Sequence, residues 1–285
     1  MSNPGYSAYV PCFNAAATLR AAVESILAQT VPPAEVLVID DGSERDPSPV
    51  LAGLPARLLR LERNLGRGAA RSRAMAAVNG ELVLCCDATN VLPPEFAQCA
   101  MKWFSDERVA AACGPLRDPA PQGAVARWRA RHLFKEGMRP ARVTHRAVLA
   151  TYGAMARRSA IAGVGGFDPT LRHSEDADLS GRLSAAGWNV VFDPALATIC
   201  NVRNTCGEVL ERYWRWTAGK DEAFTLKAFA RTAWFAWRTL AVGDLARGDA
   251  GAAGISLVLP FYLAATAARR RLSGERQRPQ PAGRR

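Results

Sequence analysis

The sequence lacks the C-x-x-C cysteine spacing of zinc sites and redox motifs, and its seven cysteines are an odd number. Two of them, Cys85 and Cys86, lie inside an apolar run. A reduced, cytoplasmic setting explains this usage better than a disulfide framework or a zinc site. Residues 1–11 also lack the basic and apolar regions of a signal peptide. We therefore expect the folded part of the chain to stay inside the cell.

Acidic residues are scarce at the C-terminal end of this chain, whose formal net charge is +11. From Leu263 onward there are seven arginines and one acid, Glu275. More than half of the positive excess therefore lies in a tail, whereas a nucleic-acid-binding surface would need it spread over a groove. We predict no nucleic-acid partner, and a basic, disordered tail over residues 272–285.

Apolar, strand-like runs alternate with segments of helical periodicity in the first ninety residues. Strands are predicted near 6–10, 35–40, 56–61 and 81–86, and helices near 15–28 and 67–78. This order is typical of an α/β fold, with a Rossmann-like, mainly parallel sheet flanked by helices. With 285 residues and 49% hydrophobic composition, the chain can bury a sizeable core.

Four polar loops follow these strands, namely PCFN at 11–14, DDGS at 40–43, NLGRGAAR at 64–71 and the segment that begins at Asp87. The carboxyl ends of parallel strands share one edge, where such sheets bind ligands. Each loop also has a structural explanation: DDGS can be only a turn, and Gly66-x-Gly68 can cradle phosphate or merely turn the chain. The third glycine of the dinucleotide fingerprint is absent, so we do not expect a dehydrogenase.

A resemblance to the family 2 inverting glycosyltransferases is carried by six segments in order: VPCFN, VIDDGS, ERNLGRGAAR, GELVLCCDATNVLPPEF, GGFDP and SEDADLSGRL. It covers roughly residues 6–216 and implies a GT-A fold and a nucleotide-diphosphate sugar as donor. The donor-binding residues that it implies are Pro11, Phe13 and Asn14 at the nucleotide pocket, Asp40 and Asp41 at the base and ribose, Gly66 and Arg71 near the nucleotide, and Asp87 at the diphosphate.

The leaving diphosphate sets a physical requirement at this site. Its departure adds negative charge at the bridging oxygen, and a cation or arginines must receive that charge. Arg67, Arg71 and Arg73 are close in sequence, although helical spacing lets only some of them face one pocket.

Residues 173–183, HSEDADLSGRL, supply acids for the other half of the chemistry. Inversion requires one carboxylate to take the proton of the acceptor during in-line attack. The resemblance assigns this role to Asp176, with Glu175 beside it and Asp178 near the closing acceptor or donor. Acids at the head of a helix can instead act as caps that the helix dipole favours, and we expect one of the three to do so.

The metal-binding motif is incomplete. Family members usually carry a second aspartate where this chain has Thr89, and commonly a histidine whose nearest match here is Cys200 or Asn201. Magnesium and manganese prefer carboxylate oxygen, so the predicted metal site, with Asp87 as its ligand, is weakened. Three explanations stay open: Asp87 and the phosphates hold Mn or Mg weakly, arginines replace the cation, or the protein is a non-catalytic relative.

Residues 212–216, RYWRW, resemble the Q-x-x-R-W motif of processive family members, with Arg212 in place of glutamine. Arg215 and Trp216 match the end of the motif and are candidates for closing over donor or acceptor. Because that glutamine and the several long spans of a polymer channel are lacking, transfer of a single sugar is favoured. Trp214 and Trp216 could stack on a sugar or lipid, although partly buried packing is the commoner use of such side chains.

The C-terminal region predicts a membrane location. Residues 250–268 carry no charge and precede three arginines, a length that just reaches a bilayer span but is weakly apolar. Residues 228–243 mix tryptophans with arginines, as interfacial helices do, while a helical pair packed on the domain is the alternative. We predict a glycosyltransferase domain over 1–220 and C-terminal apolar helices over 221–271 that meet anionic lipid at the cytoplasmic face of the inner membrane.

The sequence as a whole predicts transfer of one sugar from a nucleotide-diphosphate sugar to an envelope or lipid-linked acceptor, with inversion. The rival hypothesis is a non-catalytic membrane subunit that binds the nucleotide sugar without turnover.

Overall fold

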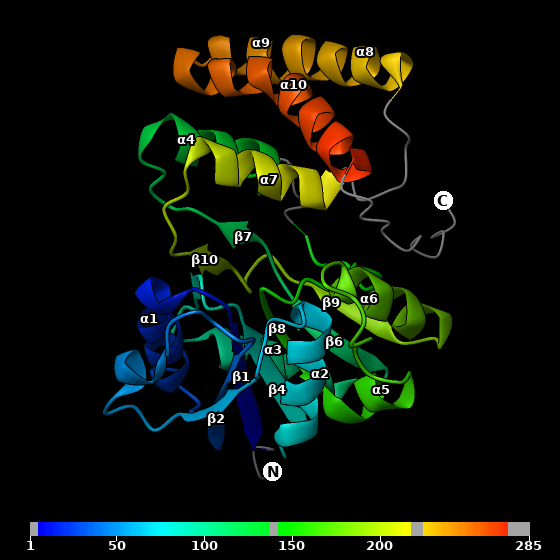
Figure 1. The fold of residues 1–285 in the computed structure, drawn as a ribbon. Helices are drawn as coiled ribbons and strands as arrows, with labels where there is room; N and C mark the ends of the chain where they lie inside the picture. Colours follow the sequence, from blue (N-terminus) through cyan, green and yellow to red (C-terminus); the bar gives the residue numbers. More distant parts are fainter. Residues whose placement is uncertain (1–4, 137–141, 218–224, 273–285) are drawn as a thin grey trace. The chain divides into compact units, whose positions relative to one another are not determined.

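The computed structural model describes residues 5–136, 142–217 and 225–272, and its chain divides into two compact units (Figure 1). The first, here called the sheet unit, comprises Met1–Arg117 and Arg139–Val202. The second, the helical unit, comprises Asp118–Met138 and Arg203–Arg285. Segment 118–138 is thus grouped with the C-terminal residues, which the predicted boundary near 220 did not anticipate. The predicted tail over 272–285 lies almost entirely outside the described residues.

The sheet unit contains a seven-stranded sheet in the order β3-β2-β1-β4-β8-β6-β9. Its strands are β1 (Tyr6–Cys12), β2 (Glu35–Asp40), β3 (Arg57–Arg60), β4 (Leu82–Cys86), β6 (Val109–Cys113), β8 (Gly153–Arg157) and β9 (Asn189–Phe192). Only β8 runs against its neighbours, β4 and β6, among the described pairings of this sheet. The four strands predicted from the sequence are β1 to β4, so the mainly parallel α/β fold is confirmed.

A smaller sheet in the same unit has the order β5-β10-β7, formed by β5 (Asn90–Val91), β10 (Thr198–Cys200) and β7 (Leu116–Arg117). The helices of the sheet unit are α1 (Ala16–Leu27), η1 (Ser48–Leu51), α2 (Arg67–Ala77), α3 (Phe96–Met101), η2 (Lys102–Ser105), α5 (Arg158–Gly163) and α6 (Glu175–Ala185). The two helices predicted in the first ninety residues, α1 and α2, are confirmed.

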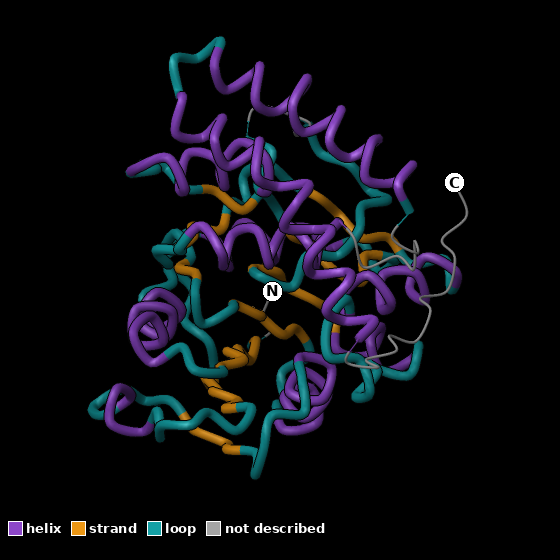
Figure 2. Tube along the Cα trace, turned by 45° about the horizontal axis from the view of Figure 1, so that its top comes forward, coloured by secondary structure: helices purple, strands orange, loops and turns teal. Residues whose placement is uncertain are grey.

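Helices cover both faces of the large sheet because strand side chains alternate between faces. From β1, Val10 packs with Leu19 and Ile26 of α1, whereas its neighbour Tyr9 packs with Ala70 of α2 on the other face. Each fully buried Leu, Val or Ile stabilises the fold by about 1.5–3 kcal/mol. Figure 2 shows the strands of the sheet with helices on either side. Because β1 pairs in parallel with both β2 and β4, the carboxyl ends of these three strands share one edge of the sheet.

The helical unit contains α4 (Gly123–Trp128), η3 (Arg129–Leu133), α7 (Cys206–Thr217), α8 (Leu226–Phe235), η4 (Ala236–Ala241), α9 (Val242–Leu245) and α10 (Ala250–Leu272). Elements α8, η4 and α9 follow one another without a break, and α10 packs against all three and against α4. Trp128, at the end of α4, is fully buried among these helices.

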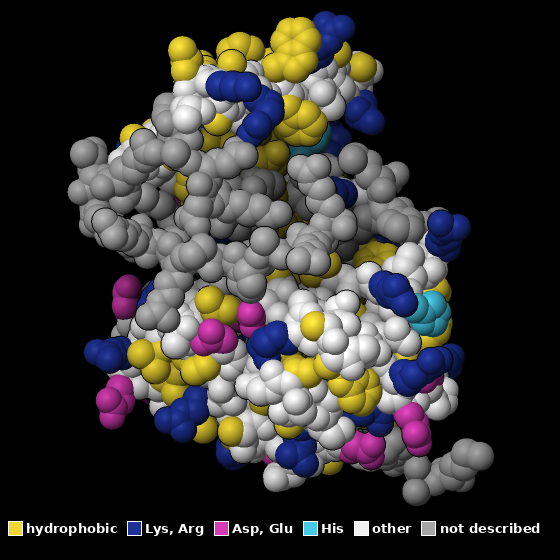
Figure 3. Space-filling view, turned by 90° about the vertical axis from the view of Figure 1, so that its right-hand side faces the viewer, with side chains coloured by type: hydrophobic (Ala, Val, Ile, Leu, Met, Phe, Trp, Pro, Cys, Tyr) yellow, Lys and Arg dark blue, Asp and Glu magenta, His cyan; other side chains and the backbone are white. Residues whose placement is uncertain are grey.

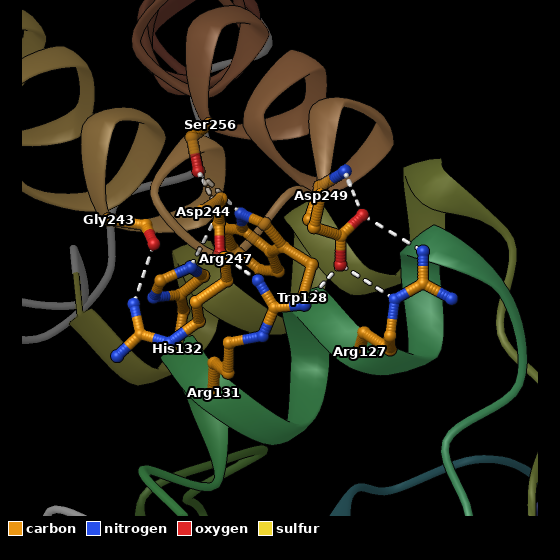
Figure 4. Close-up of polar contacts among 10 residues, drawn as sticks. Arg127, Trp128, Arg131, His132, Gly243, Asp244, Arg247, Asp249 and Ser256 are labelled. Atoms are coloured by element: carbon orange, nitrogen blue, oxygen red, sulfur yellow. Dashed lines mark hydrogen bonds and ion pairs between the residues drawn. The ribbon is translucent and has the colours of Figure 1, made fainter.

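A buried charged cluster joins the two chain segments of the helical unit, and we call it the Asp244 network (Figure 4). Its members are Arg127, Trp128, Arg131, His132, Asp244, Asp249 and Ser256. Arg127 makes a bidentate pair with Asp249 at 2.6 and 2.9 Å, and Arg131 pairs with both aspartates. His132 Nε2 lies 2.9 Å from Asp244. Because Asp244 is fully buried, its charge depends on these partners.

Substitution of Asp244 by alanine tests this dependence. It removes the buried partner of His132 and one of the two carboxylates that pair with Arg131, so we expect the free energy of unfolding in urea to fall by about 3 kcal/mol. The control is Glu24→Ala, which breaks the exposed Arg20–Glu24 pair on α1 and should cost less than about 1 kcal/mol. Equal losses in the two variants would show that the Asp244 network does not stabilise the helical unit.

Candidate active site

The loop after β2 holds its two aspartates in separate networks. Asp40 is fully buried, accepts hydrogen bonds from the amide and hydroxyl of Ser43, and lies 3.2 Å from Nε of Arg60. The carboxylate of Asp41 accepts 2.8 Å hydrogen bonds from the amides of Leu65 and Gly66. Burial raises the pKa of Asp41, although these two amides oppose the rise. Both predicted base- and ribose-binding residues are thus tied to neighbouring loops of the same edge.

The glycine loop before α2 is shaped by close packing. Gly66 has a φ of +99°, and a Cβ there would lie 2.6 Å from the Cα of Arg172. The amide of Gly68 donates to the carbonyl of Leu171 at 2.9 Å. The amides of residues 65–68 therefore all have protein partners. Of the two readings of Gly66-x-Gly68, this geometry favours the turn over a phosphate cradle, and a donor-binding role for Gly66 stays a prediction.

The loop after β1 is hydrogen-bonded to the loop after β2. The amide of Asn14 donates to Ser43 Oγ at 2.8 Å, and its side-chain oxygen accepts from the amide of Glu44 at 3.0 Å. Pro11 is partly buried within β1, while Phe13 is 46% exposed. An exposed aromatic ring beside the strand ends suits the nucleotide contact predicted for Phe13, which stays a prediction together with those of Pro11 and Asn14.

Arg71 is buried at the centre of the site, with 1% of its side chain exposed. Its Nη2 donates to Asp87 Oδ1 at 2.7 Å, and its Nε donates to Glu175 Oε1 at 2.9 Å. Its Nη1 lies 2.6 Å from the sulfur of Cys85 and 3.4 Å from the hydroxyl of Tyr9. Its guanidinium is enclosed by protein and joins the end of β4 to the head of α6. The donor-binding role near the nucleotide stays a prediction for Arg71.

Glu175, Asp176 and Asp178 occupy the first turn of α6. Glu175 is buried, and its Oε2 has no hydrogen-bond partner among the described residues. Asp178 pairs with Arg182 one turn later, at 2.7 Å. This gives Asp178 a structural partner, and its role at acceptor or donor closure stays a prediction.

Asp176, in the same turn, has a raised pKa. Burial, and then the charge of Glu175, raise its pKa to about 6, while Arg71 and Arg67 oppose the rise. Its Oδ1 accepts a hydrogen bond from the amide of Ala177 at 2.8 Å. A carboxylate with a pKa near neutrality is suited to accept a proton at physiological pH.

Arg67 differs from Arg71 and Arg73 of the same helix in its exposure and in its effect on Asp176. Arg71 is buried and Arg73 is exposed, whereas Arg67 is partly buried at the first residue of the helix and close enough to Asp176 to lower its pKa. The sequence grouped the three arginines without ranking them, because the ranking depends on the approach of α6, which lies about a hundred residues later.

The predicted metal ligands do not form a site that fits a divalent cation. One oxygen of Asp87 is engaged by Arg71, and Thr89 and Asn201 offer no carboxylate. The amide of Asn201 donates to the carbonyl of Thr89 at 2.8 Å, so these two positions are neighbours, as the family pattern implies. Across the described residues, no three His, Cys, Asp or Glu side chains gather as metal ligands would.

The last predicted site residues, Arg215 and Trp216, belong to α7 in the helical unit. The ring of Trp216 lies 6.4 Å from that of Phe134 and under the guanidinium of Arg212. Arg215 lies 4.0 Å from Glu211. These contacts are within one unit, and a role in closing over donor or acceptor stays a prediction for both residues.

The chain is similar in sequence to known glycosyltransferases and polysaccharide biosynthesis proteins. The N-acetylglucosaminyltransferase of Mesorhizobium japonicum is 29% identical over 237 residues, which cover 75% of this chain and 55% of that protein. The succinoglycan biosynthesis protein ExoO of Rhizobium meliloti is 34% identical over 95 residues, which cover 32% of this chain and 27% of that protein. The chain therefore spans about half the length of these relatives or less.

A solved structure shares the fold over nearly the whole chain. The mannosyltransferase PcManGT from Pyrobaculum calidifontis, in complex with GDP-Man and Mn²⁺, superposes with a TM-score of 0.63 at 19% identity, covering 97% of this chain and 89% of that one. This likeness supports the GT-A fold. The family described as Glycosyl transferase family 2 matches residues 7–165, which is more than half of the chain. The chain thus belongs to glycosyl transferase family 2.

Proposed function

We propose that this protein transfers a single sugar from a nucleotide-diphosphate sugar to an envelope or lipid-linked acceptor, with inversion. The observation that carries the proposal is Asp176, a carboxylate with a pKa of about 6 at the head of α6, beside the buried Arg71–Glu175 pair. Family membership supports glycosyl transfer, and a relative named for succinoglycan biosynthesis supports an envelope polysaccharide as the product.

The proposed sugar transfer needs one proton acceptor, Asp176, and one leaving group, the diphosphate of the donor. The acceptor hydroxyl oxygen attacks the anomeric carbon from the face opposite the diphosphate, and Asp176 takes the hydroxyl proton. The bond from the anomeric carbon to the diphosphate oxygen breaks, and its electron pair leaves with the diphosphate. Attack and departure on opposite faces invert the anomeric configuration in one step.

Arg67 is proposed to stabilise the leaving diphosphate. It is the arginine of α2 that lies near Asp176 without being enclosed by protein. Any Mn or Mg is expected to be held mainly by the diphosphate, because among the predicted ligands only Asp87 is anionic. We place the enzyme at the cytoplasmic face of the inner membrane. The replacement of glutamine by Arg212 in the Q-x-x-R-W position supports transfer of one sugar over chain extension.

Asp176→Asn tests the assignment of the base. We expect turnover to fall by at least about a hundredfold with donor affinity nearly unchanged, because the amide cannot take the proton. In the unmodified enzyme, kcat/KM should rise with pH through about 6 and level off above it, since the base must be deprotonated.

The experiment starts with a donor screen, in which thermal shift reports binding and product formation reports turnover. Glu24→Gln is the control, because it changes an exposed acid of α1 that is no candidate site residue. Equal turnover in the Asp176→Asn and unmodified proteins would exclude Asp176 as base. Donor binding without turnover across acceptors would support the non-catalytic binding subunit.

Arg67→Gln tests the proposed cation, with Arg73→Gln as a matched control on the same helix. Loss of Arg67 should lower kcat by about tenfold or more, since charge on the leaving group is less stabilised. It should also raise the pKa of Asp176, because Arg67 now lowers it, and so move the rising limb of kcat/KM to higher pH. An unshifted limb, or the same loss in Arg73→Gln, would contradict the role of Arg67.

Thr89→Asp tests the incomplete metal site. It adds a carboxylate two residues from Asp87, so calorimetry with donor present should show tighter Mn²⁺ binding than in the unmodified protein. Thr89→Asn matches aspartate in size without its charge and should not tighten binding. Micromolar or tighter Mn²⁺ binding by the unmodified protein would show that Thr89 is not a weakened ligand position.

A further inference from the structure

Large apolar side chains are exposed along the helical unit, and together we call them the apolar face. They are Leu226, Trp234, Phe235, Trp237, Val242, Leu245, Leu257, Val258 and Phe261. Six of them, from Leu226 to Leu245, lie along the continuous helical run α8–η4–α9, and the other three lie on α10. Trp237 links this run to α10, because its Nε1 donates to the carbonyl of Leu257 at 3.1 Å and its ring lies 6.2 Å from that of Phe261.

Within the described segment 225–269, the exposed charges all have one sign. Between residues 225 and 269 the basic residues Lys227, Arg231, Arg238, Arg247 and Arg269 are exposed. The two acids of the same segment, Asp244 and Asp249, are buried in the Asp244 network. The guanidinium of Arg238 lies 5.2 Å over the ring of Trp234. Figure 3 shows hydrophobic side chains together with Lys and Arg over these helices.

Helix α10 has the length and composition to cross a membrane over Ala250–Arg269, yet a third of its most apolar 18-residue stretch is buried inside the protein. One side of α10 packs inside the helical unit, where Ala252, Ser256 and Leu259 are fully buried. Ser256 Oγ accepts a 2.7 Å hydrogen bond from Trp128 Nε1 and lies 3.3 Å from Asp244. Moving α10 into a bilayer would leave the buried Asp244 and Trp128 short of partners, which is costly.

We infer that the helical unit lies on an anionic bilayer surface through the apolar face, and that α10 does not cross the membrane. Exposed tryptophan and phenylalanine flanked by arginine match the headgroup region, where aromatic rings and basic side chains both find partners. A second copy of the chain is a poorer occupant, because its basic residues would meet like charges. The inference rests on the membrane association proposed above and is independent of sugar transfer.

Vesicle flotation of the full-length protein tests the surface. Phosphatidylcholine vesicles with phosphatidylglycerol should bind the protein, and those without it should bind at least about tenfold less. Trp234→Glu and Val258→Glu place a charge on the apolar face and should each lower the partition coefficient about tenfold or more. Val148→Glu is the matched control, because Val148 is 68% exposed but lies in the sheet unit, and it should bind as the unmodified protein does. Equal binding by all three variants would overturn the inference.

Two further measurements separate the competing arrangements. Alkaline carbonate should strip the protein from native membranes, and resistance to it would overturn the inference by showing a spanning α10. Light scattering should show a monomer, and a dimer lost in Trp234→Glu would assign the face to a second copy. Flotation uses no substrate, so the Asp176→Asn protein should bind vesicles normally whatever its activity. Failure to bind therefore counts against the membrane surface and the proposed membrane location, and failure to turn over counts against the proposed sugar transfer.

Discussion

The site depends on one buried cation, the guanidinium of Arg71. A buried arginine is costly to desolvate unless carboxylates pair with it, and here it meets Asp87 at the end of β4 and Glu175 at the head of α6. These residues lie 16 and 104 positions from it in the chain. Because Asp176 directly follows Glu175, the pair that anchors the helix also positions the proposed base. Loss of either carboxylate would leave the buried guanidinium with one partner instead of two and would weaken the compensation of its charge.

The same pairing sets the electrostatics of the base. Arg71 is shared between two carboxylates, so its positive charge only partly offsets the negative charge of the cluster. Burial raises the pKa of Asp176, and the charge of Glu175 raises it further. That surplus of negative charge suits a proton acceptor but disfavours a diphosphate. An electropositive partner for the donor is therefore required outside the buried pair, and Arg67, or a cation that the diphosphate itself carries, meets that requirement.

The sequence was sufficient for the features that depend on local pattern. Alternating apolar runs located β1 to β4 with α1 and α2, and the order of the motifs indicated the GT-A fold. It was insufficient where partners are distant in the chain. Nothing near Arg71 in sequence reveals its pairing with Glu175, and the grouping of segment 118–138 with α10 depends on pairs such as Arg131–Asp244, 113 positions apart. The hydropathy of residues 250–268 did not distinguish a core helix from a membrane span, because both have such a composition. The hydrogen bond from Trp128 to Ser256 favours the core helix.

A protein that lies on a bilayer gains a different advantage from one that spans it. Its attachment combines burial of a few aromatic side chains with attraction between arginines and anionic headgroups, so it is reversible and weakens with salt. While attached in the proposed way, it would meet the proposed lipid-linked acceptor by diffusion in the membrane plane, which would raise the effective concentration of acceptor without any added contact at the active site. The nucleotide sugar, by contrast, would arrive from solution. On the proposed arrangement, the lipid composition of the membrane would control access to the acceptor and the charge balance around Arg71 would control the chemistry. The two could vary independently because they depend on different residues.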